Sequence, residues 1–246
     1  GPSRRAALLQ PTGMDDVVVV YGRMRQGLSA AQLRSLARSF QEVALDLGTG
    51  DGRFVYRMAQ RCPQTLWIGV DPAPEALAKY SARAIRKPAR GGLPAANALF
   101  IAATVEALPA ALDGLAGRIY VHLPWGSLLR GLLLAEPAIL IPIARAAAPS
   151  ARLDIYLNTT AFLERVPGEL RELPTPTPEY CRAVMAPAYA ALGITLVEWA
   201  PLGRRELARL DSTWARRIAQ ARHPQALYLQ GMIASGLSLP AAPRSP

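Results

Sequence analysis

A short apolar run that breaks into alternating glycines, VALDLGTGDGRFVYRMA (residues 43–59), decides the fold of this chain. Residues 43–47 read as a buried strand, and residues 52–61 read as a helix. Glycines between a strand and a helix bring the backbone close to a ligand, and the amino terminus of the helix favours an anion there. The stretch therefore predicts the first strand, loop and helix of an α/β domain that binds a ligand.

Strand and helix patterns alternate along the rest of the chain. Apolar strand patterns occur at residues 43–47, 66–71, 98–103, 118–123, 151–157, 194–200 and 226–234. Helical patterns occur at residues 29–40, 52–61, 74–87, 127–147, 178–192 and 204–222. Repeated alternation predicts a parallel sheet with helices on both faces, and the last two strands read as an antiparallel pair. We therefore expect an α/β fold on a seven-stranded, mostly parallel Rossmann-like sheet.

Length and composition predict the domain organisation. A chain of 246 residues is long enough for one large α/β domain. Its first two residues, Gly-Pro, resemble the scar of a cleaved tag, so the start of the chain is left out of the fold. We expect a tag remnant or disordered tail at residues 1–13, a single domain at 14–236 with an N-terminal β-hairpin at 17–28 and an insertion at 200–224, and a flexible tail at 237–246.

Cysteine usage and hydropathy indicate a cytoplasmic protein. Only Cys62 and Cys181 are present, and their spacing fits neither a disulfide framework nor a metal site, so we expect no metal. The apolar run at residues 132–144 is interrupted by Glu136 and two prolines, so we expect no membrane span. The start of the chain lacks the apolar core of a signal peptide.

The charge of the chain is strongly basic and carried by arginine. The sequence has 28 Lys+Arg against 18 Asp+Glu, a net charge of +10, and only Lys79 and Lys87 are lysines. Guanidinium groups stay charged and bind phosphate oxygens in a fork, which favours a nucleic-acid partner. A GC-rich genome also favours arginine, so the positions of the arginines must decide between these readings.

The acidic residue beside the glycines indicates which cofactor the loop holds. Asp46 precedes Gly48, Gly50 and Gly52, which gives a G-x-G-x-G spacing rather than the G-x-G-x-x-G of dinucleotide-binding loops. A carboxylate here would repel a pyrophosphate, but it could accept a hydrogen bond from the ammonium of a methionine moiety. The loop therefore favours S-adenosylmethionine (SAM) over NAD.

Residues after the next two strands fit the same cofactor. Asp71 ends the strand at 66–71, where an acidic side chain can accept from both ribose hydroxyls, although it could also cap the following helix. The strand at 98–103 is followed by a segment expected to reach the adenine, although it also reads as a loop and helix start. Its residues are Thr104, Val105 and Glu106.

Two tryptophans are candidates for holding the group that is methylated. The fourth strand of the sheet ends in HLPWGSLLRG (residues 122–131), which lacks the polar acceptor of the D/N-P-P-aromatic motif that many amine methyltransferases carry. A ring nitrogen such as N1 of adenine has a lone pair and needs positioning rather than a base. Trp125 and Trp214 could form a slot for a flipped base, or both could be core residues, as we expect for Trp67 and Trp199.

The motifs LDLGTGDGR, GVDP, KPARGGLP, LPWGSLLRG and STWARR, in this order, resemble the aminoglycoside-resistance methyltransferases of the kanamycin–apramycin type. That family modifies N1 of adenine 1408 in bacterial 16S rRNA, and the similarity covers residues 17–234. The resemblance implies a class I SAM-dependent methyltransferase fold and a target adenine clamped by Trp125 and Trp214, with Ser212 nearby. It implies a cofactor site lined by Asp46, Gly48, Asp71, Thr104, Glu106 and Ser127.

The arginines cluster where this family docks on rRNA phosphates. The first cluster consists of Arg83, Arg86, Lys87 and Arg90, and the second of Arg204, Arg205, Arg209, Arg216, Arg217 and Arg222. Few acidic residues separate them, which weakens the reading of a solvated charged face. One departure is Pro224, preceded by His223, where relatives carry a further basic residue.

The resemblance implies a monomer that acts on the assembled 30S subunit, at the helix 44 region of 16S rRNA, and gives aminoglycoside resistance. Two alternatives stay open at this point. A tRNA guanine-N7 methyltransferase shares the glycine loop and the basic surface. A weakly active 30S-binding protein could retain the cofactor fold without efficient methyl transfer.

Overall fold

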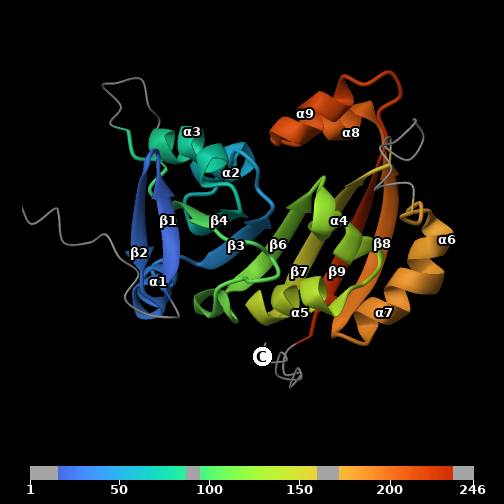
Figure 1. The fold of residues 1–246 in the computed structure, drawn as a ribbon, viewed down its shortest axis with the longest axis horizontal. Helices are drawn as coiled ribbons and strands as arrows, with labels where there is room; N and C mark the ends of the chain where they lie inside the picture. Colours follow the sequence, from blue (N-terminus) through green and yellow to red (C-terminus); the bar gives the residue numbers. More distant parts are fainter. Residues whose placement is uncertain (1–15, 87–94, 160–171, 235–246) are drawn as a thin grey trace, which may run out of the picture.

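A computed structural model describes residues 16–86, 95–159 and 172–234 of the chain. One nine-stranded sheet runs through it, with helices packed on both faces (Figure 1). The strands are β1 (Val17–Tyr21), β2 (Met24–Leu28), β3 (Glu42–Leu47), β4 (Thr65–Asp71), β5 (Ala98–Ala102), β6 (Ala116–His122), β7 (Ala147–Asn158), β8 (Ile194–Leu202) and β9 (Ala226–Ile233). The helices are α1 (Ala30–Ala37), α2 (Arg53–Arg61), α3 (Pro74–Ala84), α4 (Gly126–Leu133), α5 (Pro137–Ala146), α6 (Pro178–Tyr180), α7 (Ala186–Ala190), α8 (Arg204–Arg209) and α9 (Thr213–Ala219).

The strand order is β2-β1-β5-β4-β3-β6-β7-β9-β8. Strands β5, β4, β3, β6 and β7 are parallel to one another, and β9 runs antiparallel between β7 and β8. This order confirms the predicted mostly parallel, Rossmann-like sheet, but the sheet has nine strands rather than the predicted seven. Strand β4 lies on one side of β3 and strand β6 lies on the other, so the order of the strands reverses beside β3. In open α/β sheets, ligands bind at such a point.

The N-terminal hairpin joins the sheet, which the sequence-based expectation of seven strands did not include. Strand β1 pairs antiparallel with β5 through Val19 and Ile101. Val17, Val19 and Val20 of β1 are all buried, because the strand presents apolar side chains to both faces of the sheet. The hairpin thereby covers the edge of β5, and the sheet has nine strands.

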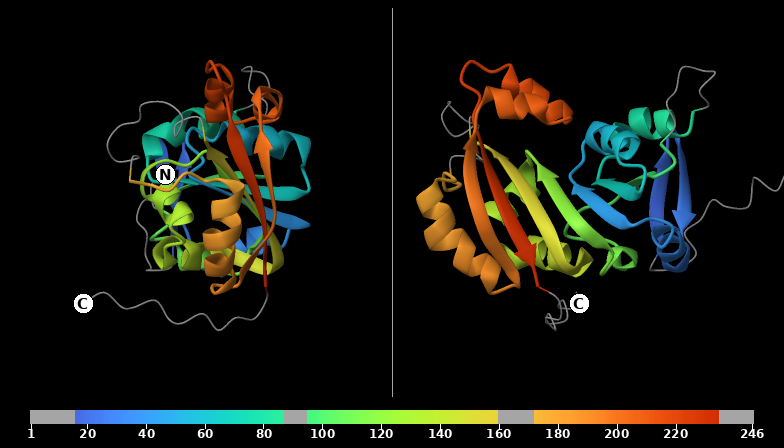
Figure 2. Two further views of the ribbon diagram at one scale, coloured as in Figure 1. Left: turned by 90° about the vertical axis from the view of Figure 1, so that its right-hand side faces the viewer. Right: turned by 180° about the vertical axis from the view of Figure 1, so that it is seen from behind.

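Both faces of the sheet are covered, as Figure 2 shows in two further views. Successive residues of β3 belong to different hydrophobic clusters: Leu45 and Leu47 pack with residues of α1, α4 and α5, and Ala44 packs with residues of α2 and α3. This alternation is the two-residue period of a strand buried on both faces. Trp67 is 2% exposed and belongs to the second cluster, as expected for a core residue.

Three predicted helices have an internal irregularity. The helix expected at residues 127–147 is two helices, α4 and α5, bent by 92°, because Ala135 has a φ of 53° and Pro137 starts the second helix. Between α6 and α7 the helix contains a π-helical turn at Cys181–Met185. The insertion before β9 consists of α8 and α9 rather than one helix.

Within the described residues no single helix is long and apolar enough to span a membrane, and only α4 and α5 taken together, bent at their junction, reach that length and composition.

Candidate active site

The glycine loop between β3 and α2 turns sharply at the carboxyl end of β3. Gly48, Gly50 and Gly52 have φ values of 68°, 64° and 79°, in the left-handed region that side chains disfavour. A Cβ atom on Gly52 would lie 2.4 Å from the ring of Phe100, so the loop also needs glycine there for space. The loop therefore brings backbone N–H groups to the edge of the sheet where the strand order reverses.

A cavity of about 250 Å³ opens beside this loop. Loops that follow β3, β4, β5 and β6 line it, so one cavity joins segments that are far apart in the sequence. Its lining consists of Gly48, Asp71, Pro72, Ala103, Thr104, Val105, Glu106, Leu123, Pro124, Trp125, Ser127 and Leu128. The structure thus brings together Gly48, Asp71, Ser127 and the predicted adenine-binding segment. Among the cofactor-binding residues expected from the sequence, Asp46 and Gly50 lie outside this lining.

Asp71 joins the glycine loop to the start of α3. Its Oδ2 accepts from the backbone N–H of Gly50 at 2.9 Å, and its Oδ1 accepts from that of Ala73 at 2.9 Å. Burial raises the pKa of Asp71 above its usual value, nearby Asp46 adds to the rise, and the two backbone hydrogen bonds oppose it. The carboxylate therefore orders both loops while it lines the cavity, so its helix-start role and a cofactor role are compatible.

Trp125 lines the cavity, and the ring of Trp214 lies beside that of Trp125 at a tilt. Their ring centroids are 6.0 Å apart with an interplanar angle of 54°. The side chains are exposed, at 45% and 38%, so the alternative that both are core residues is wrong. Trp125 precedes α4 between two left-handed residues, Leu123 and Gly126. Trp214 lies in the first turn of α9, so the two tryptophans come from segments that are far apart in the sequence.

The comparison with known proteins decides the family. The family model described as NpmA, 16S rRNA (adenine(1408)-N(1))-methyltransferase, matches residues 18–233. The chain belongs to the 16S rRNA (adenine(1408)-N(1))-methyltransferase family. A relative of that name from Streptoalloteichus tenebrarius is 39% identical over 203 residues, which cover 82% of this chain and 92% of the relative. One from Escherichia coli is 29% identical over 218 residues, which cover 88% and 99%.

Solved structures of the same enzyme class have the same fold. The 16S rRNA methyltransferase KamB aligns with a TM-score of 0.80 and 38% identity, covering 88% of this chain and 99% of that chain. A tryptophan-to-alanine mutant of the enzyme from Catenulisporales acidiphilia, solved with its cosubstrate SAM, aligns with a TM-score of 0.81 and 33% identity, covering 94% and 99%. The predicted class I methyltransferase fold is therefore confirmed.

In this member of the family, Asp46 faces inward rather than into the cavity. It is 1% exposed, its Oδ2 accepts from the hydroxyl of Thr49 at 2.6 Å, and its Oδ1 lies 2.9 Å from Nδ1 of His122. Each oxygen of Asp46 thus has one partner inside the protein, the hydroxyl of Thr49 or the ring of His122, and the contact with the methionine ammonium stays a prediction. The carboxylate supports the glycine loop by accepting the hydrogen bond from Thr49.

His122 is a site residue that the sequence reasoning missed. Its ring stacks on Tyr156 with a centroid distance of 4.9 Å and an interplanar angle of 8°, and Phe54 lies 4.2 Å from it on α2. The available signal was a polar residue inside an apolar strand, directly before the Leu-Pro-Trp motif. Buried polar side chains need a hydrogen-bond partner, and Asp46 at the end of the neighbouring strand β3 supplies one to His122.

Ser212 lies close to Trp214 in the sequence, as the resemblance implied, and its side chain has a structural role. It is 7% exposed, and its hydroxyl accepts from the backbone N–H of Ala215 at 3.4 Å as the N-cap of α9. The described lining of the cavity does not include it. The hydroxyl of Thr104 is likewise used by the turn, accepting from the N–H of Ala107 at 3.2 Å, although Thr104 lines the cavity.

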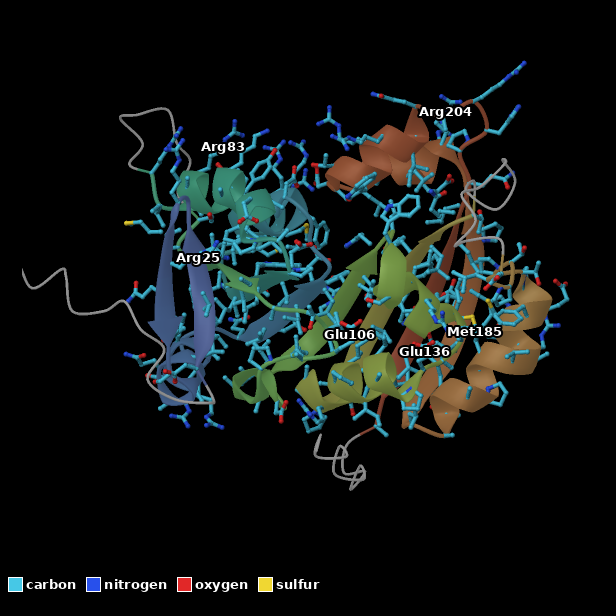
Figure 3. The ribbon with its side chains drawn as sticks, in the orientation of Figure 1. Arg25, Arg83, Glu106, Glu136, Met185 and Arg204 are labelled. Atoms are coloured by element: carbon cyan, nitrogen blue, oxygen red, sulfur yellow. The ribbon has the colours of Figure 1, made fainter. Side chains whose placement is uncertain are left out.

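Exposed arginines of the predicted clusters lie on or next to α3, α8 and α9, and Arg217 lies over the ring of Trp214 at 5.2 Å. Arg83 and Arg204 mark the two groups in Figure 3, at the edge of the molecule where α3 and α8 lie. Exposed members of the predicted clusters are Arg83, Arg86, Arg204, Arg205, Arg209, Arg216, Arg217 and Arg222. Lys87 and Arg90 fall outside the described residues. Pro224 is buried.

The sequence reasoning also missed a row of arginines on α2. Arg53, Arg57 and Arg61 are spaced four residues apart, so they share one face of the helix. This four-residue spacing in the sequence could have predicted that the three arginines share one face. Arg53 donates to the hydroxyl of Tyr80 at 3.3 Å, and Arg61 forms an ion pair with Asp211. This face of α2 therefore lies between the basic groups of α3 and α9.

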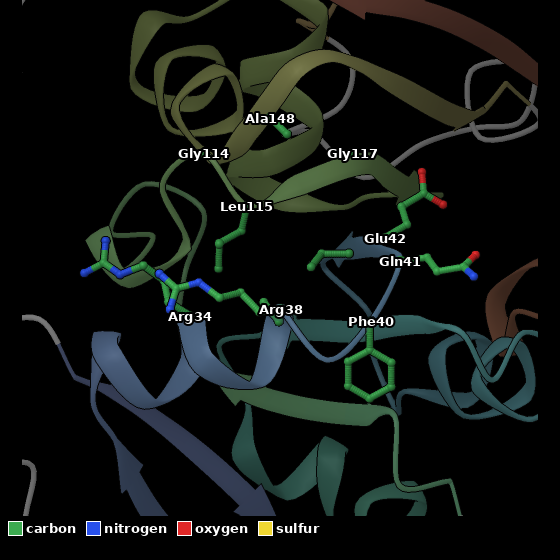
Figure 4. Close-up of a pocket in the computed structure, with 11 residues that line it drawn as sticks. Arg34, Arg38, Phe40, Gln41, Glu42, Gly114, Leu115, Gly117 and Ala148 are labelled. Atoms are coloured by element: carbon green, nitrogen blue, oxygen red, sulfur yellow. The ribbon is translucent and has the colours of Figure 1, made fainter.

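A second hollow, of about 370 Å³, lies at the amino ends of β3 and β6 (Figure 4). Arg34 and Arg38 of α1 line it together with Glu42 and Leu115. It is at the opposite end of the parallel strands from the glycine loop. None of the site residues predicted from the sequence belongs to its described lining.

Proposed function

We propose that the chain transfers a methyl group from SAM to N1 of adenine 1408 of 16S rRNA in the 30S subunit, and that this gives aminoglycoside resistance. The observation that carries the proposal is the pair of exposed tryptophans with ring centroids 6.0 Å apart, of which Trp125 lines the cavity beside the glycine loop. Membership of the family supports the same target.

The residues that line the cavity fit SAM by their chemistry. Asp71 offers carboxylate oxygens to ribose hydroxyls, and Val105 and Leu128, which both line the cavity, offer apolar surface to an adenine ring. Gly48 lets the backbone approach the methionine end. When bound, SAM would supply an electrophilic methyl group on its sulfonium. The chain holds no acidic ligand set for a metal among the residues described.

The tryptophans would orient the reacting base. N1 of adenine carries a lone pair and no proton at neutral pH, so the reaction needs no general base, and the catalytic contribution comes from orientation. Stacking is worth on the order of 1–3 kcal/mol per base, comparable with the few kcal/mol that extruding a base costs. Trp125 and Trp214 therefore serve as the groups that hold the flipped adenine, and their π faces also suit the cationic product.

The exposed arginines would dock the enzyme on rRNA. Exposed guanidinium groups lie on α3, α8 and α9, with Arg217 next to Trp214, and their fork geometry suits phosphate oxygens. We propose docking near helix 44 by a monomer in the cytoplasm. Arg204 is also used inside the protein, because it donates to the backbone oxygen of Ala221 at 3.0 Å, so it closes the insertion as well as adding charge.

Primer extension on purified 30S subunits tests the proposal. Subunits incubated with the protein and SAM should give a reverse-transcriptase stop at adenine 1408, because methylation blocks the Watson–Crick edge. Deproteinised tRNA, offered as acceptor in a parallel reaction, should remain unmethylated. Tight 30S binding without a stop would instead identify a binding protein that retains the cofactor fold. Expression in a susceptible bacterium should raise the inhibitory concentration of kanamycin and apramycin.

A further inference from the structure

Asp51, the acidic residue inside the glycine motif, lies outside the described lining of the cavity and joins two helices. Its Oδ1 accepts from the backbone N–H of Arg53 at 3.1 Å, at the start of α2. Its Oδ2 accepts from the hydroxyl of Thr213 at 2.8 Å. Thr213 is the first residue of α9 and lies 162 positions later in the chain. One carboxylate therefore connects the cofactor loop to the helix that carries Trp214.

A second connection joins the other end of α2 to the same segment. Arg61, the last residue of α2, forms an ion pair with Asp211, two residues before Thr213. The side chain of Asp211 is 18% exposed, whereas that of Arg61 is 57% exposed, so the carboxylate is the more enclosed partner. The loop residue just before α2 and the last residue of α2 thus contact Thr213 and Asp211, at the start of α9 and just before it. The helices α2 and α9 lie at the same end of the sheet (Figure 1).

The apolar contacts of the insertion do not fix its orientation in the same way. Leu207, Ala215 and Ile218 pack in a small cluster with Leu123 and Ala226. Such contacts are non-directional, and α9 has only 7 residues. A hydrogen bond and an ion pair at one end restrict rotation, because each has preferred distances and angles.

Trp214 follows Thr213 directly, so these connections act on its indole ring. A Cβ atom at Gly50 would lie 3.6 Å from Nε1 of Trp214, which places the ring against the glycine loop. The same ring forms the slot with Trp125 at 6.0 Å. A shift of α9 relative to α2 would change the distance and the angle between the rings of Trp214 and Trp125.

We propose that Asp51, Thr213, Arg61 and Asp211 are positioning residues that fix Trp214 against the cofactor loop. They couple the RNA-recognition insertion to the loop that lines the cofactor cavity, so the distance between the target base and the methyl donor is set by α2. The inference rests on the proposed function, in which Trp214 holds the target adenine.

Substitutions at Thr213 test the hydrogen bond. Thr213→Val removes the hydroxyl with little change of volume, and Thr213→Ser keeps it. Thr213→Val should lower the single-turnover methylation rate of 30S by about tenfold or more, since small misplacements at a reacting centre cost up to about 100-fold. Thr213→Ser should restore the rate to within about twofold of the unsubstituted protein, and the Kd of SAM from calorimetry should stay unchanged in both.

Thr195→Val is the matched control, because Thr195 is exposed on β8 and far from the slot in the sequence and the sheet. It should methylate 30S at the original rate. A merely structural role of Thr213 would lower SAM affinity and thermal stability together with the rate. Equal single-turnover rates for Thr213→Val and Thr195→Val would overturn the inference.

A charge swap tests the ion pair. Arg61→Asp and Asp211→Arg should each slow single turnover, and the double variant should recover most of the rate, because the pair is restored in reverse. A double variant as slow as the product of the two single effects would contradict a pairing role. The proposed function has its own test, because full activity of Trp214→Ala would refute the proposal that Trp214 holds the target adenine. If Trp214→Ala methylates 30S slowly while the Thr213 and charge variants keep the normal single-turnover rate, only the positioning role is refuted.

Discussion

Nδ1 of His122 lies 2.9 Å from Oδ1 of Asp46 beneath the glycine loop, and the two side chains are 4% and 2% exposed. The other carboxylate oxygen accepts from Thr49, which belongs to the loop itself. The acidic residue that marks the cofactor loop in the sequence is therefore an internal support of that loop. Its partner comes from the end of β6, directly before the segment that carries Trp125.

Replacing His122 should destabilise the protein. His122→Leu leaves Oδ1 of Asp46 buried without its partner, which typically costs about 1–3 kcal/mol of unfolding free energy. His122→Asn keeps an N–H donor near the same place and should lose less. Urea denaturation followed by circular dichroism measures both. Equal stability of the leucine and asparagine variants would show that the contact with Asp46 contributes nothing.

Replacing either slot tryptophan should slow methyl transfer. Stacking worth on the order of 1–3 kcal/mol per base corresponds to roughly 5- to 150-fold in rate. Trp125→Ala and Trp214→Ala should each fall in this range for incorporation of labelled methyl groups into 30S, and the phenylalanine variants should retain more activity. Trp199→Phe is the control, because Trp199 packs against the core on β8 and should not affect the rate. Wild-type turnover by both alanine variants would rule out the slot.

Asp71 should make SAM binding depend on pH. Burial raises the pKa of this carboxyl, so the group takes up a proton at a higher pH than an ordinary aspartate does. Ribose hydroxyls need the ionised acceptor, and SAM affinity should therefore fall as the pH is lowered through the raised pKa and recover above it. Calorimetric titrations over a pH series measure this. Asp71→Asn should bind SAM more weakly and lack this component of the pH dependence; an identical profile in both proteins would contradict a ribose contact.

The same raised pKa has a consequence for folding. The folded state binds the proton of Asp71 more tightly than the unfolded state does, so this group favours folding at low pH and loses that contribution as the pH rises through its folded pKa. The difference in unfolding free energy between the parent and Asp71→Asn should therefore change with pH in that window. Urea midpoints of both proteins measured across the same pH series test this. A difference that stays constant with pH would show that burial does not shift the pKa of Asp71.

Arginines at the rim should control the salt dependence of 30S binding. Arg216 is exposed on α9. If it contacts a phosphate, Arg216→Ala should weaken binding and reduce the slope of log K against log salt by about 1. Arg34→Ala is the matched control, since Arg34 lies at the opposite end of the strands and should leave the slope unchanged. Filter binding at several potassium concentrations separates the two, and equal slopes would exclude a phosphate contact by Arg216.

Local patterns were sufficient to predict much of the fold and the cavity. The glycine motif and the alternation of strands and helices depend on residues close together in the sequence. The helix caps at Ser29 and Thr177 are equally local, and both hydroxyls accept from a backbone N–H three residues on. Because the carboxyl ends of parallel strands meet at one edge, the strand order then placed Asp71 and Ser127 beside the same cavity.

The sequence by itself thus determined the class of fold, the family and the edge of the sheet where the cofactor cavity lies. Only the tertiary structure decided which side chains face the cavity and which support it. Asp46 faces His122 and Asp51 faces Thr213, in each case because a segment more than 70 residues away supplies the partner. The direction of a carboxylate depends on how distant strands and helices pack, and neither periodicity nor spacing along the chain contains that information.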